Sequence, residues 1–364
     1  MVNKIVNEYV PEYVTHPGET LEDILEENGM TQAELAKRTG RPKKTINEII
    51  NGKAAITPET AIQFEKVFGI PSSFWNNRQS IYDAYVAKKI ENERLKKYID
   101  WLMLFPIRSM ITLHWINEFS DKVMQLNELL TFFGVNSPDE WRLVWSHPKA
   151  VFRHSPSFNR NIESSSVWFR KGEIEANKIP CQRFNKNSFR TVLNEIITLT
   201  NESPDVFEEK IVNLCADVGV AVVFIPSLKG VPVFGVTRWL TPEKALIQLT
   251  LRGKYEDIFW FSFFHEAGHI LLHGKRDIFI ESSDKIDFKE DEADTFAKNI
   301  LIPQKKWNDF IVPKSYFSKN KVINFATQLS VSPAIIVGRL QHERLIPHSH
   351  MNNLRRKYEI IKSN

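Results

Sequence analysis

The chain has 364 residues, of which 42% are hydrophobic and 25% charged, and its formal net charge is only +4. This is an ordinary globular composition, long enough for two or three domains, and the small net charge gives no argument for a membrane or an acidic partner. Cys181 and Cys215 form no Cys-x-x-Cys pair, which fits a reducing cytoplasm and excludes a cysteine-based zinc site. The N-terminus carries no apolar signal segment, so we expect a cytoplasmic protein without a membrane partner.

Four short helices are predicted near the N-terminus. An amphipathic segment over 21–28 stops at a glycine, and the capping box Thr31-Gln32-Ala33-Glu34 opens the second helix. Gly40 supplies a tight turn before a third helix over 42–50, and Thr57-Pro58-Glu59 caps a fourth helix. Short helices with a glycine turn between the second and the third predict an all-α helix-turn-helix domain, whose third helix would enter the major groove.

An acid-free basic cluster surrounds the start of the third predicted helix and suits phosphate contacts: Lys37, Arg38, Arg41, Lys43 and Lys44. Because the first ninety residues together are close to neutral, nonspecific DNA binding should be weak. We therefore predict a DNA-binding domain over residues 1–90. Its contacts with operator DNA are expected from Arg41, Lys43, Lys44, Thr45 and Asn47.

The same region contains Thr31-Gln32-Ala33-Glu34-Leu35-Ala36, a run from Thr45 to Ala61, and Phe74-Trp75. These segments resemble the HigA-type antitoxins of the Xre helix-turn-helix superfamily, over about His16 to Lys88. The resemblance implies a homodimer that binds its own operator and neutralises a partner toxin. The present chain is several times longer than such antitoxins, so toxin neutralisation does not transfer automatically.

Residues 91–161 carry no motif and are predicted to form a helical connector. The segment 90–97 is typical of a charged helix leaving the DNA-binding domain. The apolar segment 101–116 is interrupted by Pro106 and is too short to cross a bilayer, which predicts a broken, buried helix. Helical periodicity follows over 113–133 and stops before a glycine.

The most informative motif of the chain is His265-Glu266-x-x-His269. Two histidines four apart share one helix face and can bind one metal ion, and the glutamate can take a proton from water on that metal. The flanking segments 258–264 and 270–272 are almost entirely apolar, so the helix should be buried. A polar group there needs a partner, because an unpaired one costs on the order of 1–3 kcal/mol. The motif predicts a zinc hydrolase site; the alternative is a packing helix with two core-facing histidines.

A second helix beginning near Lys289 follows at a spacing that suits a third ligand. One face of it carries Glu290, Ala293, Asp294, Ala297 and Leu301. Since the alanines permit close approach, Glu290 is the predicted third zinc ligand, and Asp294 should accept a hydrogen bond from a ligand histidine. Glu292 lies on another face and ranks second as a ligand, and both it and Asp291 are expected to be solvated charges.

Helix length disfavours His273 as a direct ligand unless the helix breaks before it. On a continuous helix it lies eight residues beyond His265, a rise of about 12 Å, which is too far for one metal ion. Gly274 indicates that the helix ends there, which places His273 at the C-terminal end of the helix dipole.

The C-terminal region combines His265-Glu266-x-x-His269 with Glu290-x-Glu292-Ala293-Asp294-x-Phe296-Ala297 and Leu301-Ile302-Pro303. A helix end followed by a buried strand over 214–224 precedes them. Together these motifs resemble the ImmA/IrrE family of bacterial metallopeptidases, over about residues 163–303. The resemblance implies an α+β zincin-like metallopeptidase domain, placed at 162–364, that cleaves repressors related to the helix-turn-helix class.

Beyond Pro303 the chain is predicted to be helical again, with a capped helix over 330–340. The basic tail Arg355-Arg356-Lys357 is expected to be solvated and without function.

The sequence as a whole predicts a mainly α protein with a small β-sheet. Its predicted function is that of a cytoplasmic regulator with sequence-specific DNA binding and zinc-dependent endopeptidase activity on a repressor or a toxin–antitoxin component. In that mechanism His265, His269 and Glu290 hold Zn²⁺, and Glu266 is the general base. The alternative is an antitoxin or repressor that binds operator DNA and a toxin, with a non-catalytic zinc domain.

Overall fold

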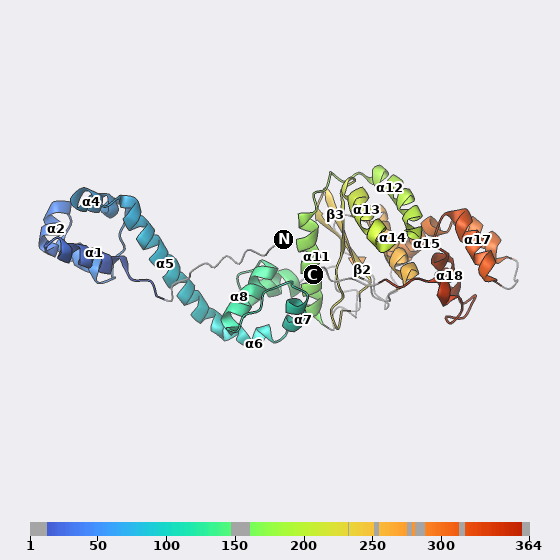
Figure 1. Ribbon diagram of the computed structural model, residues 1–364, viewed down its shortest axis with the longest axis horizontal. Helices are drawn as coiled ribbons and strands as arrows, with labels where there is room; N and C mark the ends of the chain where they lie inside the picture. The colour runs from blue at the N-terminus through green and yellow to red at the C-terminus, as the bar shows by residue number, and fades with distance from the viewer. Residues whose placement is uncertain are drawn as a thin grey trace. The chain divides into compact units, whose positions relative to one another are not determined.

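The computed structural model describes residues 13–146, 161–231, 233–250, 255–274, 279–280, 288–312 and 317–358. The chain divides into two compact units, residues 1–98 and 99–364, and each is described by itself (Figure 1). The predicted fold class, mainly α with a small sheet, is confirmed. The finer division, with a connector over 91–161, stays a prediction, and residues 147–160 lie outside the described residues.

The N-terminal unit is all-α. Its elements are α1 (Pro17–Glu27), α2 (Gln32–Thr39), α3 (Lys43–Ile50), α4 (Pro58–Phe68), α5 (Ser72–Leu95) and the short η1 (Lys96–Tyr98). The predicted caps begin α2 and α4, where Thr31 Oγ1 and Thr57 Oγ1 accept from amides three residues on, at 3.2 and 3.3 Å. Only half of the predicted capping box at Thr31 forms, because the Glu34 carboxylate accepts from Arg38 at 2.7 Å instead.

The first helix begins earlier than predicted, because its cap is a histidine. His16 Nδ1 accepts from the amide of Gly18 at 2.8 Å, and the Glu19 carboxylate accepts from the amide of His16 at 3.3 Å. Gly40 ends α2 at φ 69°, a left-handed conformation that favours glycine. The core of this unit comprises Leu21, Leu25, Leu35, Ala36, Ile46, Ile49, Ile50, Ile56, Ala61, Phe64 and Trp75.

The C-terminal unit opens with short helices that pack through aromatic rings. They are α6 (Ile99–Leu102), α7 (Ile107–Thr112), α8 (Lys122–Phe133), α9 (Pro138–Trp141) and the π-helical η2 (Arg142–Ser146). The broken helix predicted around Pro106 is confirmed by α6 and α7. The helix predicted over 113–133 begins only at Lys122, because Asp121 Oδ1 accepts from the amide of Met124 and fixes the start there.

A small sheet follows, together with the helices that flank it. The elements are α11 (Ile162–Lys178), α12 (Lys186–Thr198), η4 (Leu199–Asn201), α13 (Pro204–Ala216), β1 (Val220–Phe224), β2 (Gly235–Thr241) and β3 (Lys244–Leu249). With β4 (Phe279–Ile280) the strand order is β1-β3-β2-β4. β1 runs parallel to β3, Val222 opposite Ile247, and β2 runs antiparallel to both β3 and β4.

Both faces of the sheet are covered, and they differ in chemistry. Ala245, Ile247 and Leu249 of β3 alternate into the main hydrophobic core. Gln248 points to the opposite face, where its side-chain amide donates to the carbonyl of Trp168 on α11 at 2.7 Å.

The remaining helices complete the main core and position the site. They are α14 (Glu256–Leu272), α15 (Phe288–Leu301), α16 (Gln304–Ile311), α17 (Lys319–Leu329), α18 (Pro333–His342) and the short η5 (Asn352–Leu354). α14 packs against β2 and β3 on one side and along α15 on another. The two helices approach closely at Gly268, where a Cβ would lie 3.3 Å from the Cα of Ala293. Ala293 and Ala297 are fully buried at this contact.

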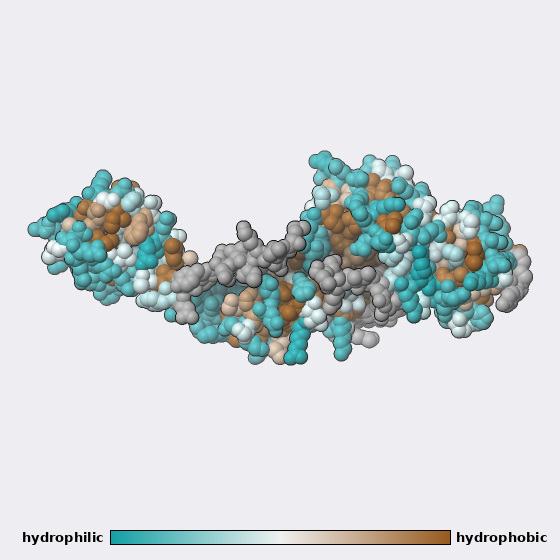
Figure 2. All heavy atoms as spheres, in the orientation of Figure 1, coloured by the Kyte–Doolittle hydropathy of each residue, from teal (hydrophilic) through white to brown (hydrophobic). Residues whose placement is uncertain are grey.

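Hydrophilic residues dominate the visible face of each unit, with apolar residues showing between them (Figure 2). Within the described ranges, no helix combines the length and the apolar character needed to cross a bilayer.

Candidate metal centre and nucleic-acid interface

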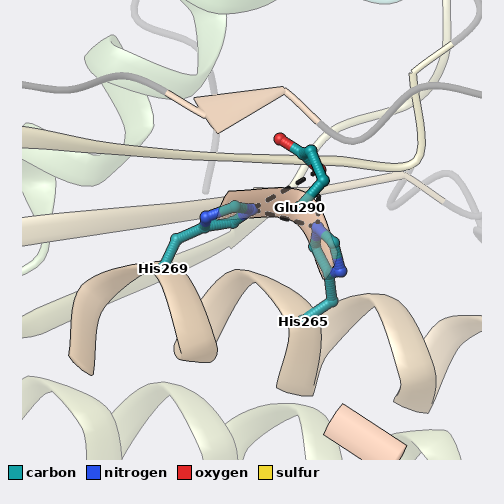
Figure 3. A group of neighbouring side chains, drawn as sticks. All are labelled: His265, His269 and Glu290. Carbon is teal, nitrogen blue, oxygen red and sulfur yellow. Dashed lines mark hydrogen bonds and ion pairs between the residues drawn. The ribbon is translucent and has the colours of Figure 1, made fainter. Parts of the chain in front are cut away.

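Three side chains from two helices converge on one point in the C-terminal unit. His265 and His269 project from consecutive turns of α14, and Glu290 reaches toward them from the first turn of α15 (Figure 3). Glu290 Oε2 lies 3.1 Å from His265 Nε2 and 3.7 Å from His269 Nε2, and the two Nε2 atoms are 3.0 Å apart. Both histidines are buried, so the cluster lies within the protein core.

The second ring nitrogen of each histidine has its own partner. His265 Nδ1 lies 2.9 Å from Asp294 Oδ1, and His269 Nδ1 lies 2.9 Å from His273 Nδ1. His273 Nε2 in turn lies 3.1 Å from Glu292 Oε2. His265 has a carboxylate beside each ring nitrogen, Asp294 at Nδ1 and Glu290 at Nε2, and a neutral ring can donate to only one of them. A carboxylate only accepts, so the contact with Glu292 puts the proton of a neutral His273 on Nε2, and its Nδ1 then accepts from His269.

The tautomer of His265 that donates from Nδ1 to Asp294 leaves a lone pair on both Nε2 atoms. In that state two acceptor nitrogens face one another at 3.0 Å, beside the carboxylate of Glu290. Three converging acceptors repel each other unless a cation lies between them, so the donor set fits a metal ion. All three ligating atoms lie within 4.8 Å of one another. Ligands about 2.0–2.1 Å from a tetrahedral zinc would lie about 3.3 Å apart, which is close to the spacing found.

The protonation states of these residues also suit a metal. Burial lowers the pKa of His269 to about 4, so the imidazole is neutral, the form that binds metal, at pH 7. Burial opposes ionisation of Glu290, but its contacts with His265 and His269 outweigh that effect and hold the pKa of its carboxyl well below the usual range. Asp294 behaves similarly: burial opposes ionisation, and the contact with His265 lowers the pKa of its carboxyl.

Glu266, the predicted general base, is fully buried between α14 and β2. A Cβ at Gly235 would lie 2.7 Å from Glu266 Oε1, so the first residue of β2 must be glycine for the carboxylate to occupy its position. Thr237, also on β2, donates from Oγ1 to the carbonyl of Glu266 at 3.0 Å. Sequence reasoning missed both residues, because no local pattern links this strand to the histidine helix.

The helix ends where Gly274 indicated, with His273 as the C-cap residue of α14. The Asp291 side chain is exposed, as expected of a solvated charge. The same prediction for Glu292 is only partly correct, because its side chain is 42% exposed but its carboxylate holds His273. The structure thus brings together His265, His269 and Glu290, while their role as ligands stays a prediction.

The prediction that the basic tail is solvated is wrong for Arg355, whereas Arg356 and Lys357 are exposed. Arg355 makes two hydrogen bonds of 2.8 Å to the carboxylate of Asp257, and both side chains are at most 10% exposed. Arg356 binds Glu256 at 2.6 Å. Glu256 and Asp257 are the first residues of α14, so the tail holds the N-terminus of the helix that carries both histidines. The partners lie about a hundred residues apart in sequence, which explains why no local pattern predicts them.

The predicted DNA-contacting residues lie at the start of α3. Lys43, Lys44 and Asn47 are exposed, with the Lys44 side chain 84% exposed. Asn47 also donates from Nδ2 to Gln32 at 3.3 Å. Thr45 is half-buried, and the residues on the opposite face of the helix are in the core.

Arg41 differs from the other predicted contacts. Its guanidinium donates to Gln63 and, at 3.4 Å, to Glu59, and its side chain is only 20% exposed. Arg41 would have to leave these partners on α4 to reach a phosphate.

Comparison with known proteins assigns the N-terminal domain to a helix-turn-helix family. The helix-turn-helix family model matches residues 21–75. The "Uncharacterized HTH-type transcriptional regulator YddM" of Escherichia coli (strain K12) is 30% identical over 84 residues, which are 23% of this chain and 89% of that protein. The chain belongs to the Xre-type helix-turn-helix family. "Virulence-associated protein A" of Dichelobacter nodosus is 41% identical over 69 residues, 18% of this chain and 68% of that protein.

HigA-like antitoxins are among the structural neighbours of this domain. One is an addiction module antidote protein of a HigA family from Coxiella burnetii, with 35% sequence identity and a TM-score of 0.22. It covers 23% of this chain and 92% of its own.

The C-terminal region matches a second family model, the IrrE N-terminal-like domain of the M78 peptidases, over residues 253–341. Both resemblances drawn from the sequence are thereby confirmed. The protein combines a helix-turn-helix domain of a DNA-binding regulator with an IrrE/ImmA-like domain of a metallopeptidase-type family.

Proposed function

We propose that this regulator is a zinc-dependent endopeptidase whose substrate is a regulatory protein, such as a repressor or a toxin–antitoxin component. The observation that carries the proposal is the convergence of His265, His269 and Glu290, whose candidate ligand atoms all lie within 4.8 Å of one another. The motif glutamate, Glu266, directly follows the first of these histidines.

His265, His269 and Glu290 would hold the zinc ion through Nε2, Nε2 and Oε2. When bound there, zinc supplies a Lewis acid that acidifies water and polarises a carbonyl group. Asp294 and His273 fix the tautomers and ring orientations of the two histidines. The surrounding core keeps bulk water away from the charges.

Glu266 is the proposed general base. Its carboxylate takes a proton from the attacking water and then delivers that proton to the amine nitrogen that leaves when the peptide bond breaks. Gly235 and the hydrogen bond from Thr237 to the Glu266 carbonyl would orient this residue from β2.

Metal content of matched variants of acidic residues tests the ligand assignment. Glu290→Gln should lose zinc, and so should His269→Ala, because each removes a ligand. Asp291→Asn is the matched control: it lies one residue away on the same helix, its side chain is exposed, and it should keep zinc. A wild-type protein that holds no zinc after zinc is added back contradicts the proposal.

Catalysis is tested with Glu266→Gln, which should keep zinc and abolish cleavage. The assay should use the repressors or toxin–antitoxin proteins encoded beside this gene, with new protein N-termini as the readout. Cleavage that survives in Glu266→Gln would exclude this residue as the base. A wild-type protein that holds zinc and cleaves none of them favours the antitoxin-like repressor with a non-catalytic zinc domain.

For the N-terminal domain we propose operator binding as a homodimer, with Lys43, Lys44, Thr45 and Asn47 of α3 in the major groove. Phe74 lies about two turns before Ile81 on the same face of α5, and the two residues are 39% and 54% exposed. Such an apolar stripe supports a symmetric contact between two copies. Ile81→Glu should shift the sedimentation of the protein toward the monomer and weaken operator binding, whereas a dimer that survives this change places the interface elsewhere.

A further inference from the structure

A side-chain-sized cavity lies beside the proposed zinc site and is not explained by metal binding. It encloses about 180 Å³ between α14, α15 and α18. Its walls are mainly apolar and include Ile258, Phe261, Leu301, Ile302 and Ile335. A cavity of about 150 Å³ lined by similar side chains holds a benzene molecule. This volume therefore suits one large aliphatic or aromatic side chain and is too small for a drug-sized ligand.

One polar wall residue of the cavity is buried without a hydrogen-bond partner. Ser262 is 3% exposed, lines the cavity, and its Oγ finds no hydrogen-bond partner among the residues that the structure describes. A buried hydroxyl without a partner is unfavourable, and native structures keep few of them. Asp257 and Arg339, which also line the cavity, are already bound to other residues of the chain.

The cavity and the metal cluster share the same faces of the same two helices. Ile258, Ser262 and His265 lie along one face of α14, and Glu290 and Leu301 lie along one face of α15. Since a helix rises about 1.5 Å per residue, Ser262 and Ile258 lie roughly 4.5 and 10.5 Å along the axis from His265. An extended peptide advances about 3.3 Å per residue, so the cavity lies about one to three residues from a bond positioned at the metal.

We propose that this cavity is a specificity pocket that receives one large apolar side chain of the polypeptide substrate, within three residues of the cleaved bond. The assignment to a substrate rests on the proposed peptidase function, whereas the ability of the pocket to bind such a side chain can be tested without catalysis.

Binding is tested by methyl NMR on the full chain with labelled isoleucines. N-acetyl-L-phenylalanine amide is the probe and N-acetylglycine amide the matched control. We expect the methyl signals of Ile258, Ile302 and Ile335 to shift with the phenylalanine probe, saturating in the millimolar range, and to stay unchanged with the glycine probe. In Ser262→Leu, which fills the cavity, binding should weaken at least tenfold, and in Ser262→Ala, which keeps its volume, binding should stay within threefold. Unmoved signals, or equal binding by Ser262→Leu and the wild type, would overturn the pocket.

Cleavage of a peptide library made from a digested proteome then tests the assignment to the substrate. The wild type should prefer Phe or Leu at one fixed position within three residues of the cut. Ser262→Leu should shift that preference to Gly or Ala at unchanged zinc content. Cleavage with no preference there, or with the same preference in both proteins, overturns the substrate assignment. Shifted methyl signals without any cleavage would refute the proposed peptidase function and leave the pocket standing.

Discussion

Replacing Arg355 by alanine should destabilise the C-terminal unit strongly, because it leaves Asp257 buried without its charged partner. Asp257 and Arg355 are 8% and 10% exposed and are joined by two hydrogen bonds of 2.8 Å. Removing one partner of a buried pair typically costs about 3–5 kcal/mol. The stacking of the guanidinium on the ring of Tyr255, at 4.0 Å, is lost as well.

Proton uptake limits the size of this effect. Burial raises the pKa of Asp257, and Arg355 opposes that rise; without Arg355 the carboxyl can escape its unpaired charge by taking up a proton. For a carboxyl with an ordinary pKa near 3.9, neutralisation costs roughly 4 kcal/mol at pH 7 and roughly 1.5 kcal/mol at pH 5. The folded variant then holds a proton that its unfolded chain releases, so the variant loses stability relative to the wild type as the pH rises. We expect a loss of about 3–4 kcal/mol at pH 7 that shrinks toward pH 5.

The assay is hydrogen exchange of the α14 amides, read together with the urea transition of the C-terminal unit. The exchange measurement isolates the helix that the pair anchors, since the whole chain need not unfold in one step. Lys306→Ala is the matched control: it removes an exposed basic residue on α16 of the same unit and should change stability by less than about 0.5 kcal/mol. A loss in Arg355→Ala no larger than that of this control, or one independent of pH, would refute the anchoring role.

Three further outcomes are expected. Gly235→Ala should place a methyl 2.7 Å from the carboxylate of the proposed base and reduce cleavage about a hundredfold while zinc is kept; loss of zinc would instead indicate a general collapse of the site. Burial lowers the pKa of His269 to about 4, so between pH 6.5 and pH 4 the unfolded chain takes up a proton on this histidine and the folded chain does not. The metal-free protein should therefore lose about 3 kcal/mol of stability as the pH falls through this interval. Urea transitions at both pH values measure this, and His269→Gln should flatten the dependence. Lys43→Ala with Lys44→Ala should weaken operator binding and reduce the slope of log K against log salt by about 1.8, whereas Lys66→Ala on α4 should leave that slope unchanged.

The parts of this protein that sequence reasoning predicted are those encoded by local patterns. Thr31 and Thr57 cap their helices because a hydroxyl three residues before an amide is sufficient to fix a helix start. His265 and His269 lie on one face because four residues make about one helical turn. The helical period of α15 and the small alanines on the face that carries Glu290 were enough to predict that Glu290 would face the two histidines.

What the sequence could not predict depends on contacts between distant segments. Gly235 looks like any glycine beside a strand until β2 is placed against Glu266. His16 became a helix cap only through the orientation of its ring, which no capping preference for serine, threonine or aspartate indicates.

The ion pairs of the basic tail also could not be predicted from the sequence, because they join residues about a hundred positions apart. A run of arginine and lysine residues is usually exposed to solvent, and that expectation holds where the run meets no buried acidic residue. Glu256 and Asp257, at the start of α14, are such buried acidic residues. Their charges interact favourably with the N-terminal end of the helix dipole, but once buried they also need a cationic partner. The tail supplies that cation, and in doing so it links the end of the described chain to the helix that carries both histidines. Truncation before Arg355 should therefore reduce zinc retention as well as stability, although none of the removed residues up to Tyr358, where the described chain ends, contacts the metal cluster.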